Sequence, residues 1–330
     1  MCALSGPESV SGELVSVIMP NFNGARFLGE AIGSVLAQTY RPVELIVVDD
    51  GSTDGSRQAI GRYGDGVTLI ALAHTGLPGR VRNRGLLAAR GGLVAFLDSD
   101  DLWLPEKLAL QVAYLEARPE VGLVHSNLQV IDGAGRYVRD IFLGCAGSRG
   151  LSDDDPEPSF VQLLNGDSGV WTSSVLVRRH VLDRVGGFDE TLTVAEDYDL
   201  WIRIAREFRI GFVPDALAKH RKHGGNAGTS WEPSLPLPQV RLWTKMLRLY
   251  PDLAEAYGPL IHAKCLFHHV VTALHCARRG RYVLAGRLLS AGLASHLPRT
   301  GYAPLKRTAL KYVTIRRLQR RAVAAGANGR

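Results

Sequence analysis

The stretch Leu93-Val94-Ala95-Phe96-Leu97-Asp98-Ser99-Asp100-Asp101 passes directly from an apolar run into three carboxylates. An unbroken apolar run of this length is typical of a strand that is covered on both faces, as in a parallel sheet. Similar runs occupy 14–19, 43–48 and 67–72, and residues 25–38 between two of them carry apolar side chains at helical spacing. This alternation predicts βαβ units and therefore an α/β fold with a mostly parallel sheet.

Polar residues follow three of these runs at the point where each predicted strand ends. They are Pro20-Asn21-Phe22-Asn23-Gly24, Asp49-Asp50-Gly51-Ser52-Thr53-Asp54 and Asp98-Ser99-Asp100-Asp101. Ligands of open parallel sheets bind beyond the carboxyl ends of the strands, so we expect these segments to line one site.

The crowded carboxylates predict a divalent cation, because such a cluster is costly unless a cation or several donors offset it. Asp98 and Asp100 are alternate residues, so one can face Mg²⁺ or Mn²⁺ while the other reaches a sugar hydroxyl. The alternative for an isolated motif of this kind is an ordinary polar turn with a helix cap. Capping by Ser52, Thr53 or Asp54 is likewise an alternative for the second segment, although it leaves the paired Asp49 and Asp50 unexplained.

Three later segments carry further candidates. The segment 76–85 has a glycine-rich entry and three arginines suited to phosphates, and Arg82 is the one expected to point inward; solvated helix arginines are the alternative. Glu196 and Asp197 open a predicted helix, where they could serve as a general base or only complement the helix dipole. His223 precedes a glycine-rich break, in a loop that could bring it toward the metal, although such histidines are usually surface residues.

Composition and charge limit the class of protein. Hydrophobic residues make up 46% and charged residues 22%, which excludes a disordered or fibrous chain. Residues 1–255 hold 25 basic and 32 acidic residues, whereas the last 75 hold 14 basic and no acidic ones. The acidic body argues against a nucleic-acid partner, and the basic end predicts either a solvated basic bundle or contact with an anionic membrane. We expect a tail over 1–13, a catalytic domain over 14–235 and a basic helical region over 236–330.

Six segments in this order resemble the family-2 glycosyltransferases over about residues 14–230. They are 15–23, 47–54, 76–85, 96–101, 186–190 and 196–201. The resemblance implies the GT-A fold, a Rossmann-type mixed sheet flanked by helices, here with a C-terminal α-helical extension. It also implies an inverting transfer of a sugar from a nucleotide-diphosphate donor to an acceptor hydroxyl.

The resemblance also implies roles for single residues. Pro20 and Asp50 would border the nucleobase, Arg82 would support the nucleotide and Asp98 would meet the ribose. Asp100 would hold Mn²⁺ or Mg²⁺ together with His223, and Asp197 would be the base, with Glu196 as the second choice. The other residues assigned to the nucleotide sugar are Asn21, Asn23, Asp49 and Ser99. His220 and Gly228 depart from the family pattern, in which many members carry Tyr and Ser.

The function expected from these features is synthesis of a polysaccharide, cell-envelope glycan or glycolipid with a UDP- or dTDP-sugar donor. A glycan, a lipid-linked sugar or a small molecule would be the acceptor. The first residues lack a basic and apolar leader, so a cytoplasmic location, with peripheral membrane contact as an option, is expected. The alternative is a catalytically silent nucleotide-sugar-binding or assembly subunit. Nucleotidyl transfer is disfavoured because residues 21–24 are not a glycine-rich, lysine-bearing loop.

Overall fold

The computed structural model describes residues 12–141, 159–165, 169–226 and 237–300. Chain contacts divide the protein into two compact units, Met1–Thr229 and Ser230–Arg330. The predicted domain boundary at 235 and most of the predicted tail lie outside the described residues, so the predicted domain limits stay predictions.

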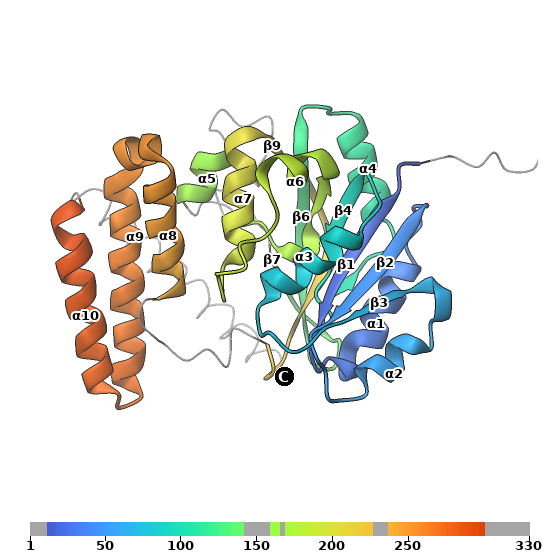
Figure 1. Cartoon of the computed structure of the whole chain (residues 1–330), viewed down its shortest axis with the longest axis horizontal. Helices are drawn as coiled ribbons and strands as arrows, with labels where there is room; N and C mark the ends of the chain where they lie inside the picture. The colour runs from blue at the N-terminus through green and yellow to red at the C-terminus, as the bar shows by residue number, and fades with distance from the viewer. Residues whose placement is uncertain (1–11, 142–158, 166–168, 227–236, 301–330) are drawn as a thin grey trace, which may run out of the picture. The chain divides into compact units, whose positions relative to one another are not determined.

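The first unit is built on one mixed sheet, to which the described residues contribute nine strands (Figure 1). Their order across the sheet is β3 (Thr68–Ala71), β2 (Val43–Asp49), β1 (Val15–Asn21), β4 (Leu93–Phe96), β8 (Leu176–Arg178), β6 (Val121–Asp132), β9 (Arg209–Lys222) and β5 (Leu102–Trp103), with β7 (Tyr137–Ile141) paired to β6. Strands β3, β2, β1 and β4 are parallel, whereas β8 is antiparallel to both β4 and β6. The α/β fold with a mixed sheet is confirmed.

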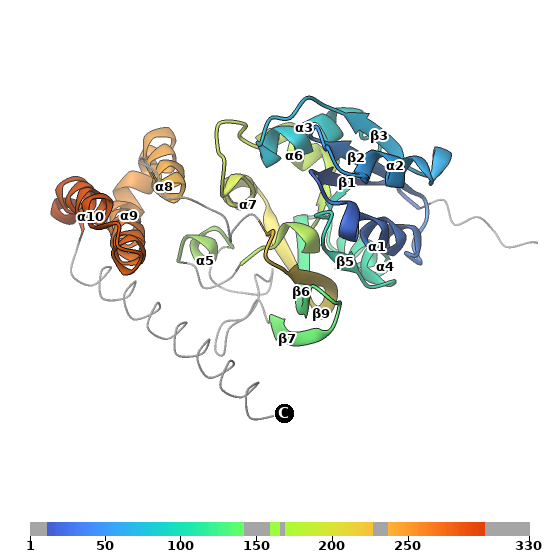
Figure 2. The ribbon, with the colours of Figure 1, turned by 90° about the horizontal axis from the view of Figure 1, so that it is seen from below.

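Helices cover both faces of this sheet, as Figure 2 shows for α1 (Ala25–Leu36) and α4 (Lys107–Glu116) on one side and α3 (Pro78–Ala88) and α6 (Arg179–Val185) on the other. Successive side chains of a strand point to opposite faces. Val17 of β1 accordingly joins the core beside α1 and α4, while Ile18 joins the core that includes α3, α6 and α7 (Glu196–Glu207). Double coverage explains why the β1, β2 and β4 runs are almost wholly apolar. The unit also contains the short helices α2 (Ser56–Gly61) and α5 (Ser159–Asn165) and the 3₁₀ turns η1 (Gly64–Gly66) and η2 (Thr172–Ser174).

Strand β9 (Arg209–Lys222) is 14 residues long. Strand β9 continues to Lys222 because it pairs in parallel with β6 along its length, with register shifts near Asn127 that accommodate Pro214 and Asp215. His220 therefore lies within this strand, whereas His223 follows the strand just before the turn at 224–225. The backbone pairing holds this segment as a strand, which a short apolar run could not reveal.

The second unit is helical, as predicted for the C-terminal extension. It contains α8 (Pro238–Leu249), α9 (Pro251–Arg278), α10 (Tyr282–His296) and the short 3₁₀ turn η3 (Leu297–Arg299). Helix α9 packs against both α8 and α10. Within the described ranges, none of the helices is both long and apolar enough to cross a bilayer.

Candidate functional site

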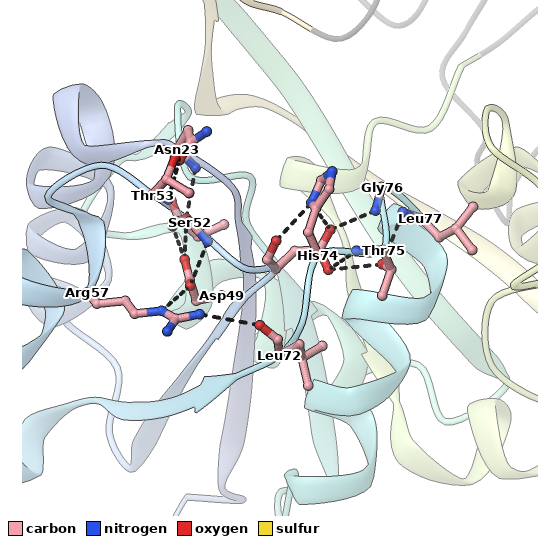
Figure 3. Close-up of polar contacts among 12 residues, drawn as sticks. Asn23, Asp49, Ser52, Thr53, Arg57, Leu72, His74, Thr75, Gly76 and Leu77 are labelled. Carbon is pink, nitrogen blue, oxygen red and sulfur yellow. Dashed lines mark hydrogen bonds and ion pairs between the residues drawn. The ribbon is translucent and has the colours of Figure 1, made fainter.

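The ends of β1 and β2 are joined by a network of hydrogen bonds around Asp49 (Figure 3). The amide Nδ2 of Asn21 donates to Asp49 Oδ1 at 2.8 Å and to Ser52 Oγ at 3.1 Å, and Arg57 Nε donates to Asp49 Oδ2 at 2.7 Å. The backbone N–H of Asn23 donates to Ser52 Oγ at 2.9 Å. Burial acts to raise the pKa of Asp49, but the bonds from Ser52 and Arg57 hold it below its ordinary value. Asn21, Asn23 and Asp49 thus connect the segments that follow β1 and β2. Their contact with a nucleotide sugar stays a prediction.

Asp50 lies next to this network and is held by the segment that precedes α3. Its Oδ1 accepts bonds from the N–H and hydroxyl of Thr75, and its Oδ2 accepts one from the N–H of Gly76, each at 2.9 Å. His74 Nδ1 lies 3.1 Å from Asp50 Oδ2. The chain turns here at Gly51, whose φ of 76° and close approach to the His74 backbone exclude a larger side chain. Asp50 is therefore fixed in place by donors from a distant segment.

An aromatic pair that the sequence analysis did not single out stands beside Asp50. The rings of Phe22 and His74 stack with centroids 4.0 Å apart, and both side chains are about half exposed, at 47% and 50%. Pro20 is on β1 and lies two residues before Phe22, which follows the strand. Phe22 lies between Asn21 and Asn23, two residues predicted to bind the nucleotide sugar, so its position in the sequence could have pointed to it. Nothing in the sequence predicts that its ring stacks on His74.

Arg82 joins the end of β4 to the start of α7. Its guanidinium donates to Asp98 Oδ1 and to Glu196 Oε1, both at 2.7 Å, and only 6% of the residue is exposed. Burial acts to lower the pKa of Arg82, but the Asp98 and Glu196 carboxylates raise it above its ordinary value. Burial raises the pKa of Glu196, against the opposing effect of Arg82. The inward orientation predicted for Arg82 is what the structure has.

Asp100 lies between the segment that follows β4 and the turn that follows β9. Its Oδ2 is 2.9 Å from His223 Nε2 and accepts a bond of 3.1 Å from Asn226 Nδ2. Burial, Asp101 and Asp98 raise the pKa of Asp100 to about 6, although His223 acts to lower it. The predicted pairing of Asp100 and His223 is therefore a close contact in the structure. Ser99, also predicted, lies beside the loop that precedes α1.

Asp101 is a buried centre of the site that the sequence did not lead us to select. Its carboxylate accepts bonds from the hydroxyl of Ser173 at 2.6 Å and the N–H of Arg221 at 2.9 Å, and lies 3.1 Å from His220 Nδ1. Burial acts to lower the pKa of His220, but the bond to Asp101 raises it. Asp101 therefore ties β9 to the end of β4, and its place in the 98–101 run was the signal for it.

A cavity of about 310 Å³ separates the carboxylates after β4 from the start of α7. Its lining is Asp98, Asp101, Val170, Trp171, Thr172, Ser173, Asp197 and His220. The hydroxyl of Thr172 donates to Asp197 Oδ2 at 2.8 Å. Ala195, just before α7, has a φ of 64°, an uncommon conformation for alanine that functional sites often contain. Asp98 and Asp197, far apart in the sequence, thus face one cavity.

The groups around Asp100 fit a hard divalent cation. A carboxylate and an imidazole lie in contact, and the pKa of Asp100 is raised by burial and by the negative charge of Asp101 and Asp98, which a cation would offset. Within the described residues, no three or more His, Cys, Asp or Glu side chains are arranged to hold a metal ion. A Mg²⁺ or Mn²⁺ ion held by Asp100 and His223 would therefore depend on water and substrate oxygens for its other ligands, as Mg²⁺ commonly does at phosphates.

Residues 16–186 match the model of the family described as "Glycosyl transferase family 2". The chain belongs to glycosyl transferase family 2. An uncharacterized glycosyltransferase of Nostoc sp. is 37% identical over 221 residues, which is 64% of this chain and 66% of that protein. The match covers only 30% of a relative from Rickettsia bellii. The Escherichia coli protein WfgD, a "UDP-Glc:alpha-D-GlcNAc-diphosphoundecaprenol beta-1,3-glucosyltransferase", is 28% identical over 61% of this chain and 73% of its own length.

Solved structures of glycosyltransferases share the fold of this family 2 chain. Residues 1–349 of Staphylococcus aureus TarS with UDP-GlcNAc superpose with a TM-score of 0.61 at 22% identity, over 82% of this chain and 79% of that one. The mannosyltransferase PcManGT of Pyrobaculum calidifontis, with GDP-Man and Mn²⁺, has a TM-score of 0.54 at 21% identity, over 98% of this chain and 88% of that one. At these identities, the likeness establishes the fold.

Proposed function

We propose that this family 2 glycosyltransferase moves one sugar from a nucleotide-diphosphate donor to an acceptor hydroxyl, with inversion at the anomeric carbon. The observation that carries the proposal is the cavity in which Asp98, on the predicted donor side, faces Asp197, on the predicted acceptor side. A single displacement needs these two sides opposite each other, because the acceptor oxygen attacks the face away from the leaving diphosphate.

We assign the base to Asp197. As the acceptor oxygen forms its bond to the anomeric carbon and the bond to the diphosphate breaks, Asp197 takes the hydroxyl proton. Thr172 orients this carboxylate by its 2.8 Å bond to Oδ2. Glu196 is disfavoured as the base because it is 7% exposed and in an ion pair with Arg82.

The donor nucleotide is proposed to lie along the ends of β2, β1 and β4. Pro20, Asp50 and the exposed ring of Phe22 would border the base, and Asp98 would accept a bond from the ribose. Arg82 would hold Asp98 in place through their 2.7 Å ion pair. The proposed donor is a UDP- or dTDP-sugar, supported by the UDP-sugars named for TarS and WfgD.

The diphosphate end is proposed to lie near Asp100 and His223, the residues that would hold Mn²⁺ or Mg²⁺. The metal would supply positive charge that stabilises the departing diphosphate. Asn226, which donates to Asp100 Oδ2, would keep the Asp100 carboxylate oriented toward that ion. The Mn²⁺ in PcManGT supports this assignment.

The proposed acceptor is a hydroxyl of a glycan or of a lipid-linked sugar, in the synthesis of a polysaccharide, cell-envelope glycan or glycolipid. WfgD, which acts on a sugar-diphosphate lipid, supports this class. A cavity of about 310 Å³ lined by Trp171, Val170 and polar groups suits one sugar ring, because sugars have both apolar faces and hydroxyls.

The test begins with thermal shifts of the full chain with UDP-glucose, UDP-GlcNAc, a dTDP-sugar and GDP-mannose, each with Mn²⁺, since a true donor raises the melting temperature by mass action. With the best donor, Asp197→Asn should bind it as the wild type does and lose transfer by about 10²–10⁴-fold. Asp183→Asn, on the exposed side of α6, is the control and should transfer normally. Transfer by Asp197→Asn at the wild-type rate would refute the base assignment, and donor binding by the wild type with no hydrolysis or transfer would identify a silent binding subunit.

A further inference from the structure

Helix α10 carries an exposed apolar stripe beside the face that packs on α9. The α10 stripe consists of Tyr282, Leu289 and Leu293 of α10 and Leu297, the first residue of η3. These residues are 72%, 40%, 40% and 45% exposed. At about 100° per residue, these four positions fall within a sector of about 80°. A sector of exposed leucines and one tyrosine is costly in water, which indicates that another apolar environment covers it.

The neighbouring face of α10 is already occupied. Ala285, Leu288, Gly292 and His296 are its buried residues. A Cβ at Gly292 would lie 2.5 Å from His269 Cβ of α9, and His296 Nδ1 is 3.1 Å from His262 Nδ1 of the same helix. Tyr282, Leu289 and Leu293 are therefore not among the α10 residues buried against α9, whereas η3, which carries Leu297, itself packs on α9.

Positive charge lies on the side of the stripe away from α9. Arg287 is exposed and, at about 100° per residue, lies about 120° from the middle of the stripe, away from the buried face, whereas Arg299 is exposed on η3. The sequence has no Asp or Glu after Glu255, whereas 14 Lys and Arg follow it. The partner that matches this surface is apolar in its interior and anionic at its boundary.

We propose that the α10 stripe is a membrane contact, by which α10 lies along the surface of an anionic bilayer. The leucines would enter the boundary between headgroups and acyl chains, Tyr282 would sit at the headgroup level, and Arg287 would bind a lipid phosphate. A helix lying in the interface needs no membrane-spanning length, which agrees with the absence of such a helix from the described part of the chain. A second copy is a poorer occupant, because residues 282–299 include Arg287 and Arg299 and no acidic residue, so two stripes in contact would bring like charges together.

The test is a vesicle flotation assay on the full chain without donor or acceptor, so its outcome is independent of sugar transfer. Vesicles of phosphatidylglycerol and phosphatidylcholine in equal parts are compared with pure phosphatidylcholine. The wild type should float with the anionic vesicles, and less so at high salt, which shortens the Debye length. Leu289→Ser/Leu293→Ser should lower the partition coefficient about tenfold or more, since each leucine loses its apolar burial. Arg287→Gln should weaken binding to the anionic vesicles alone.

Leu110→Ser is the matched control, because Leu110 is 44% exposed on α4 and is not part of the stripe. It should bind vesicles as the wild type does, and circular dichroism should show all variants folded. Equal binding by Leu289→Ser/Leu293→Ser and wild type would overturn the proposal, as would equal wild-type binding to both kinds of vesicle or to neither. A wild-type dimer in sedimentation that this double variant dissociates, with vesicle binding unchanged, would assign the stripe to a second copy instead.

Discussion

Replacing Arg82 by methionine removes the guanidinium that joins Asp98 to Glu196 and keeps most of the aliphatic volume. The two ion pairs of Arg82 are 2.7 Å long, and the side chains of Arg82 and Glu196 are 7% and 9% exposed. The variant leaves Glu196 buried without its cation, whereas Asp98, whose side chain is 38% exposed, keeps access to water. The cost therefore comes mainly from Glu196.

Removing one partner of a buried ion pair costs about 3–5 kcal/mol, and solvent at Asp98 reduces its share, so we expect Arg82→Met to lose about 3 kcal/mol of unfolding free energy. Adding Glu196→Gln removes the uncompensated charge and should recover about half of that loss. The loss of Arg82 raises the pKa of Glu196 further. Because a folded-state carboxyl with a raised pKa favours folding only when protonated, the deficit should be largest at high pH and shrink as the pH falls through that pKa.

The assay is urea unfolding followed by tryptophan fluorescence, which Trp201 in the adjoining core reports. Arg80→Met, on the same helix, is the matched control, because Arg80 is 43% exposed and 3.9 Å from Glu190; its loss should stay below about 0.5 kcal/mol. An Arg82→Met loss below about 1 kcal/mol, or no recovery in the double variant, would refute this account of the site.

Three further predictions concern the site and the core. Thr172→Val should lower kcat about tenfold with donor affinity unchanged, because Asp197 loses its orienting bond, and Thr172→Ser should restore the rate in steady-state kinetics. Asp100→Asn in the absence of metal should raise the unfolding free energy near neutral pH by about 1–3 kcal/mol, because ionising a group with a folded-state pKa of about 6 opposes folding. This gain should vanish below pH 3.8, where an aspartate in the unfolded chain is itself protonated. Urea unfolding of both proteins across this pH range measures the difference. Gly85→Ala should cost about 1–3 kcal/mol in the same measurement, because its Cβ would lie 2.5 Å from Ile18 Cγ2; an unchanged midpoint would contradict that overlap.

The order of apolar runs and the acids that follow them were sufficient to predict the parallel half of the sheet. A strand of a parallel sheet that is covered on both faces can be recognised from its local sequence, because it is an apolar run, such as 93–96, followed by a turn. The antiparallel placement of β8 between β4 and β6 was beyond such reasoning, because the partner of a short strand is chosen by packing over long distances.

The candidate residues divide in the same way. The sequence alone predicted that Asp49, Asp50 and Asp98 end strands at one edge of a sheet, because strand period and turn chemistry are local properties of the chain. Only the tertiary structure decided that Asp49 is enclosed by hydrogen bonds while Asp98 faces a cavity with Asp197. The tertiary structure also decided that Asp101 binds the Arg221 N–H of β9. Whether a carboxylate is free to bind a ligand depends on hydrogen-bond donors from segments that are remote in the sequence.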